Sequence, residues 1–328
     1  SSKCTKACAG NETQGRMMFR TLILTAAAKL IERGTLASLK ELHAVDAGGP
    51  EMARNVQERK LRTLMEHHLQ RPFYRELCEE CATNLDNISL ARLPDFPTVT
   101  KDFLRSHLTE IESTPEAYRR TSTSGSSGQN FIFYQSREAV NAASAAVRYC
   151  TGLAGVESWG DPMIGIWGHS PNPDPKTRLA QGLKRLVGNV HLLQSYGLNE
   201  ETATAYLDLI RSKRPRLLYG YPSYLYYLAQ VGESLKIKAP QPYVIVCSGE
   251  QLQPVQREMI ERYFETRLFN RYGSREFSVI AHETDSHEGL YVPPTRFVIE
   301  TDENGEFLVT DLDNMATPFI RYAIGDLG

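Results

Sequence analysis

Apolar residues in the early part of the chain recur at the three- and four-residue spacing of amphipathic helices. This spacing runs through Leu22–Ile31 and again through Ala53–Leu77. Two prolines in Leu93–Pro97 interrupt it, because proline removes a backbone donor and disfavours helical geometry in the residue before it. A short helix is expected to follow, beginning near Thr100 or Asp102. The early part of the chain is therefore predicted to be helical.

From about residue 120, short apolar runs typical of buried strands alternate with helical patterns. The strand-like runs are Phe131–Tyr134, Met163–Trp167, Leu217–Tyr219, Tyr243–Cys247 and Arg267–Tyr272. The helical patterns between them are Glu138–Gly152, Thr177–Val187, Glu200–Lys213, Ser223–Leu235 and Pro254–Phe264. Alternation of this kind predicts an α/β fold with helices covering the sheet.

The end of the chain has two further strand-like runs, Tyr291–Ile299 and Glu306–Asp311, on either side of Glu303-Asn304-Gly305. The Asn-Gly pair favours a hairpin turn, so a small β-rich segment is expected. The predicted organisation is a helical N-terminal region over residues 1–115, an α/β core over 116–290 and a β-rich segment over 291–328.

The composition argues against several classes of protein. The 328 residues are 41% hydrophobic and 23% charged, close to ordinary globular values. The net charge of −2 gives no reason to expect a nucleic acid or an anionic membrane as partner. The most apolar stretch, Met17–Ile31, contains Arg20 and Lys29, so it is too short and too charged to span a membrane. It also lacks the cleavage pattern of a signal peptide.

The six cysteines do not suggest a disulfide framework in a chain of this length, and a reducing cytoplasm is the expected location. Cys78 and Cys81 form a single C-x-x-C, and two neighbouring helix cysteines are favoured over a zinc site because no second pair completes it. His282 and His287 are five residues apart, which does not match H-E-x-x-H spacing. These residues are therefore not expected to bind a metal.

Three segments carry candidate chemistry. The first, Thr121–Gln129, is rich in serine, threonine and glycine and precedes a predicted strand. Its hydroxyls and backbone N–H groups could surround phosphate oxygens, although it lacks the Gly-Lys-Ser/Thr of a Walker loop. Taken alone, the same composition is equally typical of a flexible linker.

The second segment, Asn270–Glu276, places a tyrosine and a glycine directly after a predicted strand. An aromatic ring on a tight turn offers a flat face to a purine, and a carboxylate four residues later could hold Mg²⁺. The third, Pro318–Asp326, ends in Gly-Asp, and an aspartate there could accept hydrogen bonds from ribose hydroxyls. Each segment alone is also consistent with an ordinary turn.

In this order, and with Ser248-Gly249-Glu250 between the first two, the segments resemble the adenylate-forming superfamily of acyl-CoA synthetases. The branch that they resemble most is that of the phenylacetate–CoA ligases, including its capsular-polysaccharide-type members. The resemblance implies an acetyl-CoA-synthetase-like large N-terminal domain, with a helical lead-in, mixed sheets covered by helices, an ATP-binding core and a small C-terminal β subdomain. Further segments that resemble this branch are His67–Tyr74, Leu93–Asp102, Gly220–Leu225 and Gly305–Leu312.

The resemblance also implies a role for each segment. Glu276 would hold Mg²⁺ and Asp326 the ribose, while His169 would lie beside the acyl group, where a structural role is an equal alternative. The loop implied to hold the β- and γ-phosphates of ATP is Thr123, Ser124, Gly125, Ser126, Ser127 and Gly128. The residues implied around the adenine are Ser248, Gly249, Glu250, Asn270, Arg271, Tyr272 and Gly273. The residues implied to border the acid are Tyr219, Gly220, Tyr221, Pro222 and Ser223.

Two residues depart from the family pattern. Gln129 replaces the usual lysine after the loop, so less positive charge reaches the phosphates from that position. Arg275 stands where a threonine or serine is usual, and it could either approach the phosphates or pair with Glu276 and weaken the metal site.

The implied reaction is attack of a small carboxylic acid on the α-phosphorus of ATP, followed by transfer of the acyl group to a thiol such as coenzyme A. In the family a mobile C-terminal domain follows the Gly-Asp motif, and it is expected to be missing from these residues, so that they bind ATP but turn over poorly. Alternatives are an amine, a hydroxyl or an acyl carrier protein as acceptor, or a non-catalytic nucleotide-binding module.

Overall fold

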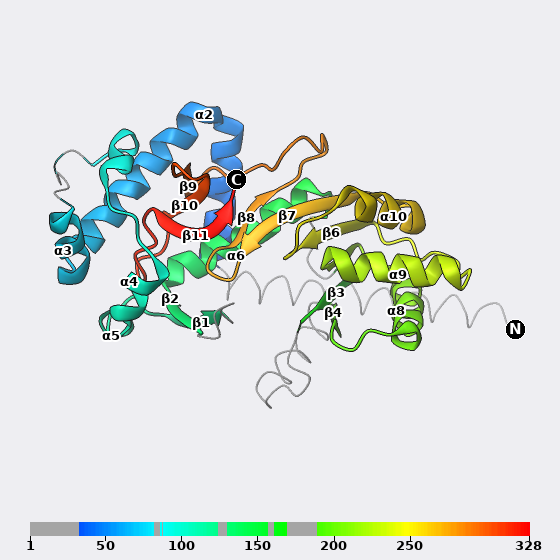
Figure 1. Ribbon diagram of the computed structural model, residues 1–328. Helices are drawn as coiled ribbons and strands as arrows, with labels where there is room; N and C mark the ends of the chain where they lie inside the picture. The colour runs from blue at the N-terminus through cyan, green and yellow to red at the C-terminus, as the bar shows by residue number, and fades with distance from the viewer. Residues whose placement is uncertain (1–32, 82–85, 87, 124–129, 157–160, 169–188) are drawn as a thin grey trace, which may run out of the picture. The chain divides into compact units, whose positions relative to one another are not determined.

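The computed structural model describes residues 33–81, 86, 88–123, 130–156, 161–168 and 189–328 (Figure 1). The predicted helices at Leu22–Ile31 and Thr177–Val187 lie outside these residues. The described chain forms two compact units. The first contains Thr151–Tyr272 and His282–Leu290, and the second contains Gly34–Cys150, Gly273–Ala281 and Tyr291–Gly328.

A six-stranded sheet has the order β4-β3-β5-β6-β7-β8; its strands from β4 to Tyr272 of β7 belong to the first unit, whereas Ser278–Ala281 of β8 belong to the second. Each pair from β4 to β7 is parallel. Strands β5 and β6 are buried along most of their length, as expected inside a parallel sheet, whereas the edge strand β4 and the later part of β7 are only partly buried. The strands are β3 (Met163–Trp167), β4 (Val190–Gln194), β5 (Leu217–Gly220), β6 (Val244–Ser248), β7 (Leu268–Ser274) and β8 (Ser278–His282).

Three helices pack on this sheet through a core that includes Ile164, Leu218 and Ile245: α8 (Glu200–Lys213), α9 (Pro222–Ser234) and α10 (Pro254–Phe264). Prolines at the first positions of α9 and α10 fix their starts, because the missing N–H would have no partner there. The absence of a side chain at Gly232 lets α9 approach α10, since a Cβ there would lie 2.1 Å from the Tyr263 ring.

The second unit begins with α2 (Arg33–His68), which is kinked at Gly49 and Pro50. The helical pattern predicted over Ala53–Leu77 is divided in two, because Pro72 starts a separate helix, α3 (Pro72–Glu80). Thr100 caps α4 (Lys101–Ser106) as expected, by accepting from the N–H of Phe103 at 3.2 Å. The remaining helices are η1 (Leu90–Asp95), α5 (Leu108–Glu112) and α6 (Arg137–Leu153).

Two small antiparallel sheets complete the second unit. The hairpin of β1 (Arg119–Thr123) and β2 (Phe131–Gln135) forms one, and a three-stranded sheet in the order β11-β10-β9 forms the other. The latter comprises β9 (Phe297–Thr301), β10 (Glu306–Asp311) and β11 (Tyr322–Leu327). Helix α2 lies beside this sheet in Figure 1, and Gln57 on it donates to the carbonyl of Phe297 at 3.1 Å.

The predicted hairpin at Glu303-Asn304-Gly305 is confirmed, since it joins β9 to β10 and Gly305 adopts a φ of 80°. The strand predicted over Tyr291–Ile299 was placed too early, because Pro293 and Pro294 cannot donate to a ladder, and β9 begins only at Phe297. Among the described residues, no helix is both long and apolar enough to cross a bilayer.

Candidate functional site

The carboxyl ends of three neighbouring parallel strands bring together the segments predicted to bind the adenine and the acid. Gly220 of β5 pairs with Cys247 of β6, and Cys247 pairs in turn with Asn270 of β7. Ser248 then pairs with Arg271. In open α/β sheets, ligands bind at this edge. The first unit therefore places Tyr219–Ser223, Ser248–Glu250 and Asn270–Tyr272 side by side.

A pair of stacked aromatic rings lies at the same edge. Trp167, the last residue of β3, stacks on Tyr221 with ring centroids 4.2 Å apart and an interplanar angle of 16°. Gly249 packs over this pair with a φ of 86°, and a Cβ there would lie 2.7 Å from the Tyr221 ring. A larger residue would therefore displace the rings, which explains why a glycine follows Ser248. Trp167 was not among the predicted site residues.

Glu250 fixes the position of helix α9 relative to β6. Its carboxylate accepts from both the backbone N–H and the hydroxyl of Ser223, at 3.1 and 2.9 Å. Ser223 lies in the first turn of α9, where backbone N–H groups have no partner within the helix and a negative charge is favoured. The carboxylate predicted near the adenine thus joins two of the predicted segments.

Asn270 is held by Glu283, a residue that sequence reasoning did not select. The Glu283 carboxylate accepts from the N–H of Asn270 at 2.7 Å and from Arg257 at 2.6 Å, and the N–H of Glu283 donates back to Asn270 at 2.9 Å. Burial would raise the pKa of Glu283, but hydrogen bonds from Arg257, Asn270 and His287 outweigh it and hold the pKa below its ordinary value. A charged Glu283 therefore fixes the backbone of β7 at Asn270.

Arg271 and Glu276 lie in different units. Arg271 donates to the hydroxyl of Thr151 at 3.2 Å in the first unit. Glu276 lies in the turn between β7 and β8, which belongs to the second unit, and is only 4% exposed. Tyr322 donates to its carboxylate at 3.3 Å, and burial followed by the nearby Glu276 raises the pKa of Tyr322, so the phenol stays protonated.

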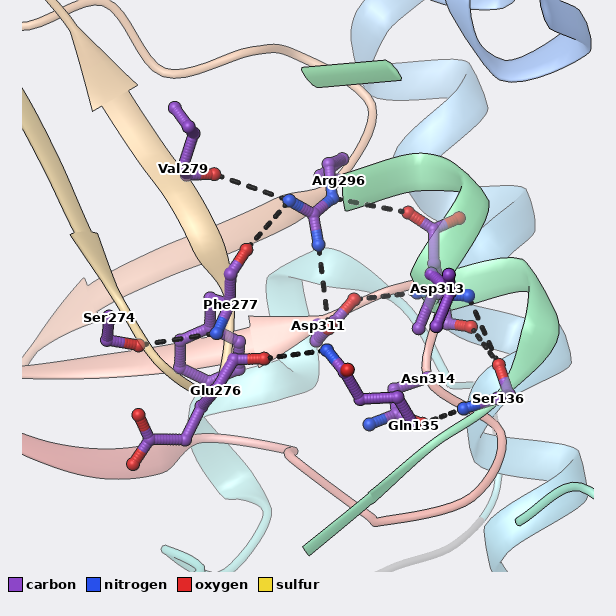
Figure 2. Close-up of polar contacts among 12 residues, drawn as sticks. Gln135, Ser136, Ser274, Glu276, Phe277, Val279, Arg296, Asp311, Asp313 and Asn314 are labelled. Atoms are coloured by element: carbon purple, nitrogen blue, oxygen red, sulfur yellow. Dashed lines mark hydrogen bonds and ion pairs between the residues drawn. The ribbon is translucent and has the colours of Figure 1, made fainter. Parts of the chain in front are cut away.

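The Glu276 carboxylate fits the expected metal. In Figure 2 it points away from Gln135 and Arg296, whereas its backbone carbonyl accepts from Gln135 at 3.2 Å. Among the described residues there is no group of three His, Cys, Asp or Glu that could form an all-protein metal site. Mg²⁺ does not need one, because it is usually bound by one or two carboxylates together with phosphate and water oxygens. The donor set is therefore consistent with Mg²⁺ held jointly by Glu276 and a nucleotide.

The remaining predicted residues of the second unit are Thr123, at the end of β1, and Asp326, which is exposed on β11. Arg275 donates to the carbonyl of Ser122 at 3.4 Å, beside the start of the predicted phosphate loop. Both alternatives for Arg275 stay predictions. Ser124, Gly125, Ser126, Ser127, Gly128 and His169 lie outside the described residues, and their roles stay predictions.

Gly273 allows the turn that carries Glu276 to close. A Cβ at this position would lie 1.9 Å from the carbonyl oxygen of Ser278, so Gly273→Ala should force the turn apart and lower the free energy of unfolding by about 1–3 kcal/mol. Chemical denaturation measures this difference. The matched control is Gly325→Ala, because Gly325 has a φ of 93° with no atom within 4 Å of a Cβ and would show backbone strain alone. Equal losses in the two variants would contradict the clash.

Comparisons with known proteins agree on the fold. No family model matches the chain. Protein CapK of Staphylococcus aureus is 24% identical over 260 residues, which cover 77% of this chain and 58% of that protein. The chain thus spans little more than half the length of this curated relative.

Solved structures of 2-hydroxyisobutyryl-CoA ligase superimpose on most of the chain. An open conformation in complex with 2-HIB-AMP and CoA gives a TM-score of 0.66 at 22% identity, covering 82% of this chain and 67% of the ligase. The thioesterification state gives 0.68 at 21% identity, covering 84% and 63%. The resemblance to adenylate-forming ligases is thereby confirmed at the level of the fold, whereas the phenylacetate–CoA ligase branch stays a prediction. The chain has the α/β fold of the adenylate-forming CoA ligases.

Proposed function

We propose that this chain binds ATP and activates a small carboxylic acid as its acyl-adenylate, with transfer to a thiol such as coenzyme A in the complete protein. One observation carries the proposal: the strand register places the segments predicted for the acid and for the adenine next to each other. The fold supports it, since 2-hydroxyisobutyryl-CoA ligase has been solved with 2-HIB-AMP and CoA.

In the proposed function, the segments at the carboxyl ends of β5, β6 and β7 would bind the organic parts of the two substrates. Tyr272 would stack on the adenine, and Tyr219–Ser223 would border the acid. Glu250 would act mainly by holding α9 against β6, because its carboxylate accepts two hydrogen bonds from Ser223. The hydrogen bonds between Glu283 and Asn270 would keep β7 fixed at Asn270 when the nucleotide binds.

The resemblance assigns the polar parts of ATP to three other residues. Glu276 would hold Mg²⁺, Thr123 would begin the phosphate loop and Asp326 would accept from the ribose hydroxyls. Bound Mg²⁺ would neutralise charge on the phosphates as pyrophosphate leaves. A carboxylate oxygen of the acid forms the new bond to the α-phosphorus, and the bond from that phosphorus to pyrophosphate breaks, so no protein nucleophile is required.

The proposal is tested by ATP–pyrophosphate exchange with the full-length protein and a panel of small carboxylic acids. At least one acid should raise exchange above the acid-free background by more than about tenfold, because pyrophosphate returns to ATP only by reversal of an acyl-adenylate, which forms only from a cognate acid. AMP release on addition of coenzyme A, carrier protein or hydroxylamine then identifies the acceptor. A folded protein that neither exchanges pyrophosphate nor binds ATP would contradict the proposal and favour a non-catalytic module.

A further inference from the structure

Arg296 is the largest fully buried side chain in the described part of the molecule and is only 1% exposed. It directly precedes β9 and belongs to no predicted motif. A buried guanidinium is costly unless its charge is balanced and its N–H groups are bonded. The groups that surround it therefore indicate what it does.

The hydrogen bonds of Arg296 go to the backbone of the turn between β7 and β8. Nη1 donates to the carbonyls of Phe277 and Val279 at 3.0 and 3.3 Å (Figure 2). These two carbonyls flank Ser278, whose φ of 62° lies in the left-handed region that non-glycine residues rarely adopt. Arg296 thus stabilises an unfavourable backbone conformation next to Glu276.

The charge of Arg296 is balanced by Asp311 and Asp313, whose carboxylates each lie 3.9 Å from its nitrogens. These separations are too long for hydrogen bonds, so the acids supply charge while the turn supplies the acceptors. Lys60 on α2 adds a second positive charge, with Nζ 2.9 Å from Asp313. Lys60 Nζ also lies 2.9 Å from Glu41, so three carboxylates and two cations are grouped around Arg296 and Lys60 in the second unit.

Two further contacts hold the same turn. Gln135 donates to the Glu276 carbonyl at 3.2 Å, and the N–H of Phe277 donates to the Ser274 hydroxyl at 3.3 Å. The backbone is therefore held at Glu276, Phe277 and Val279, whereas the Glu276 carboxylate extends away from this network in Figure 2. Arg296 is the charged residue among these contacts, and it binds two of the three positions.

We propose that Arg296 is a positioning residue for the metal site, holding the Glu276 carboxylate in place through the carbonyls of Phe277 and Val279. The inference rests on the proposed function, because it assumes that Glu276 coordinates Mg²⁺ that is also bound by ATP. Residues that orient a metal ligand typically contribute roughly 10–100-fold to metal affinity. Lysine is expected to replace Arg296 only in part, since a single ammonium lacks the planar fork that reaches several partners.

The test uses the full-length protein and isothermal titration of ATP without any acid, so that no reaction follows binding. The dissociation constant of ATP is measured with saturating Mg²⁺ and again in EDTA. The value in EDTA divided by the value with Mg²⁺ reports how much metal coordination strengthens ATP binding. Arg296→Met should reduce this ratio by about tenfold or more, with metal-free ATP binding unchanged. Arg296→Lys should lie between this variant and the unchanged protein.

Lys60→Met is the matched control, because Lys60 contacts Glu41, Asp313 and the carbonyl of Thr295 rather than the backbone of the turn between β7 and β8. It should leave the ratio unchanged. In a Glu276→Gln background, Arg296→Lys should have no further effect on the ratio, as expected when one residue acts through another.

Several outcomes would overturn the inference. An unchanged ratio in Arg296→Lys and Arg296→Met would do so, as would a loss of ATP affinity that is equal with and without Mg²⁺. If Arg296→Met fails to fold, Arg296→Lys and its double variant with Glu276→Gln decide the question. Absence of ATP binding by the unchanged protein would instead contradict the proposed function itself.

Discussion

Replacement of Glu276 by glutamine should lower the rate of adenylate formation by roughly 10²–10³, the range seen when one preorganised electrostatic contact is removed from a reacting centre. The amide preserves the volume of the side chain and can still accept from Tyr322, whose hydroxyl lies 3.3 Å from the carboxylate. It removes the negative charge that Mg²⁺ requires. The loss should therefore arise from metal coordination rather than from unfolding.

Initial rates of ATP–pyrophosphate exchange at increasing Mg²⁺ measure this effect. Glu303→Gln makes the same chemical change on an exposed hairpin turn and should keep the full rate. A Glu276→Gln protein with the rate and Mg²⁺ dependence of the unchanged protein would remove Glu276 from the metal site. It would leave the assignment of the adenine and acid segments intact, because these rest on a different part of the chain.

The second large effect is an acid-induced loss of stability caused by two buried histidines. His282 and His68 are both fully buried. Burial, followed by the charge of Arg271, lowers the pKa of His282 to about 4, and burial with Arg71 lowers the pKa of His68 well below 6.5. In the unfolded chain both pKa values return to about 6.5.

The direction in which stability changes with pH follows from the number of protons that each state binds. Between pH 6.5 and about 4 the unfolded state binds more protons at His282 than the folded state, so stability is fully present above pH 6.5 and falls as the pH is lowered. A pKa displaced from 6.5 to about 4 corresponds to about 3 kcal/mol. His68 acts in the same direction within the second unit.

Urea unfolding at a series of pH values measures this dependence. His282→Asn and His68→Gln should each reduce the slope of unfolding free energy against pH in this window, whatever their effect at neutral pH. His43→Gln on the exposed side of α2 is the control and should leave the slope unchanged. If neither buried variant flattens the curve, other groups cause the acid sensitivity.

The helices and strands that could be predicted from sequence are those whose pattern of apolar and polar residues matches their burial in the fold. Strands β3, β5 and β6 are short, mostly apolar runs in the interior of a parallel sheet, and the sequence located these strands and β7 within about two residues. Helices α8, α9 and α10 were located equally well, since prolines and a capping box mark their starts. For these strands and helices, residues within or next to the element were sufficient to predict it.

The elements that were missed depend on distant partners. Strand β1 consists of arginine, threonine and serine, and it is a strand because Thr121 pairs with Phe133 of the apolar β2. The spacing of apolar residues also did not predict strands β4, β8 and β11, since each is a short run of five or six residues that includes charged, small or polar side chains. Their conformation follows from pairing rather than from propensity.

The same distinction applies to the candidate site. Family motifs identified the segments at the strand ends, but not the residues that hold them. Arg296 meets Phe277 across 19 residues and Glu283 meets Asn270 across 13, with no motif that links either pair. Trp167 was recognised only as a strand residue, because its stacking on Tyr221 depends on the order of the strands.

The chain passes between the two units more than once, which limits how the protein can be divided into separate pieces. Gly273–Ala281, which carries Glu276, belongs to the second unit, yet it is preceded and followed along the chain by stretches of the first. No uninterrupted piece of the gene therefore encodes either unit completely. Removing either unit by a single deletion would therefore also remove part of the other.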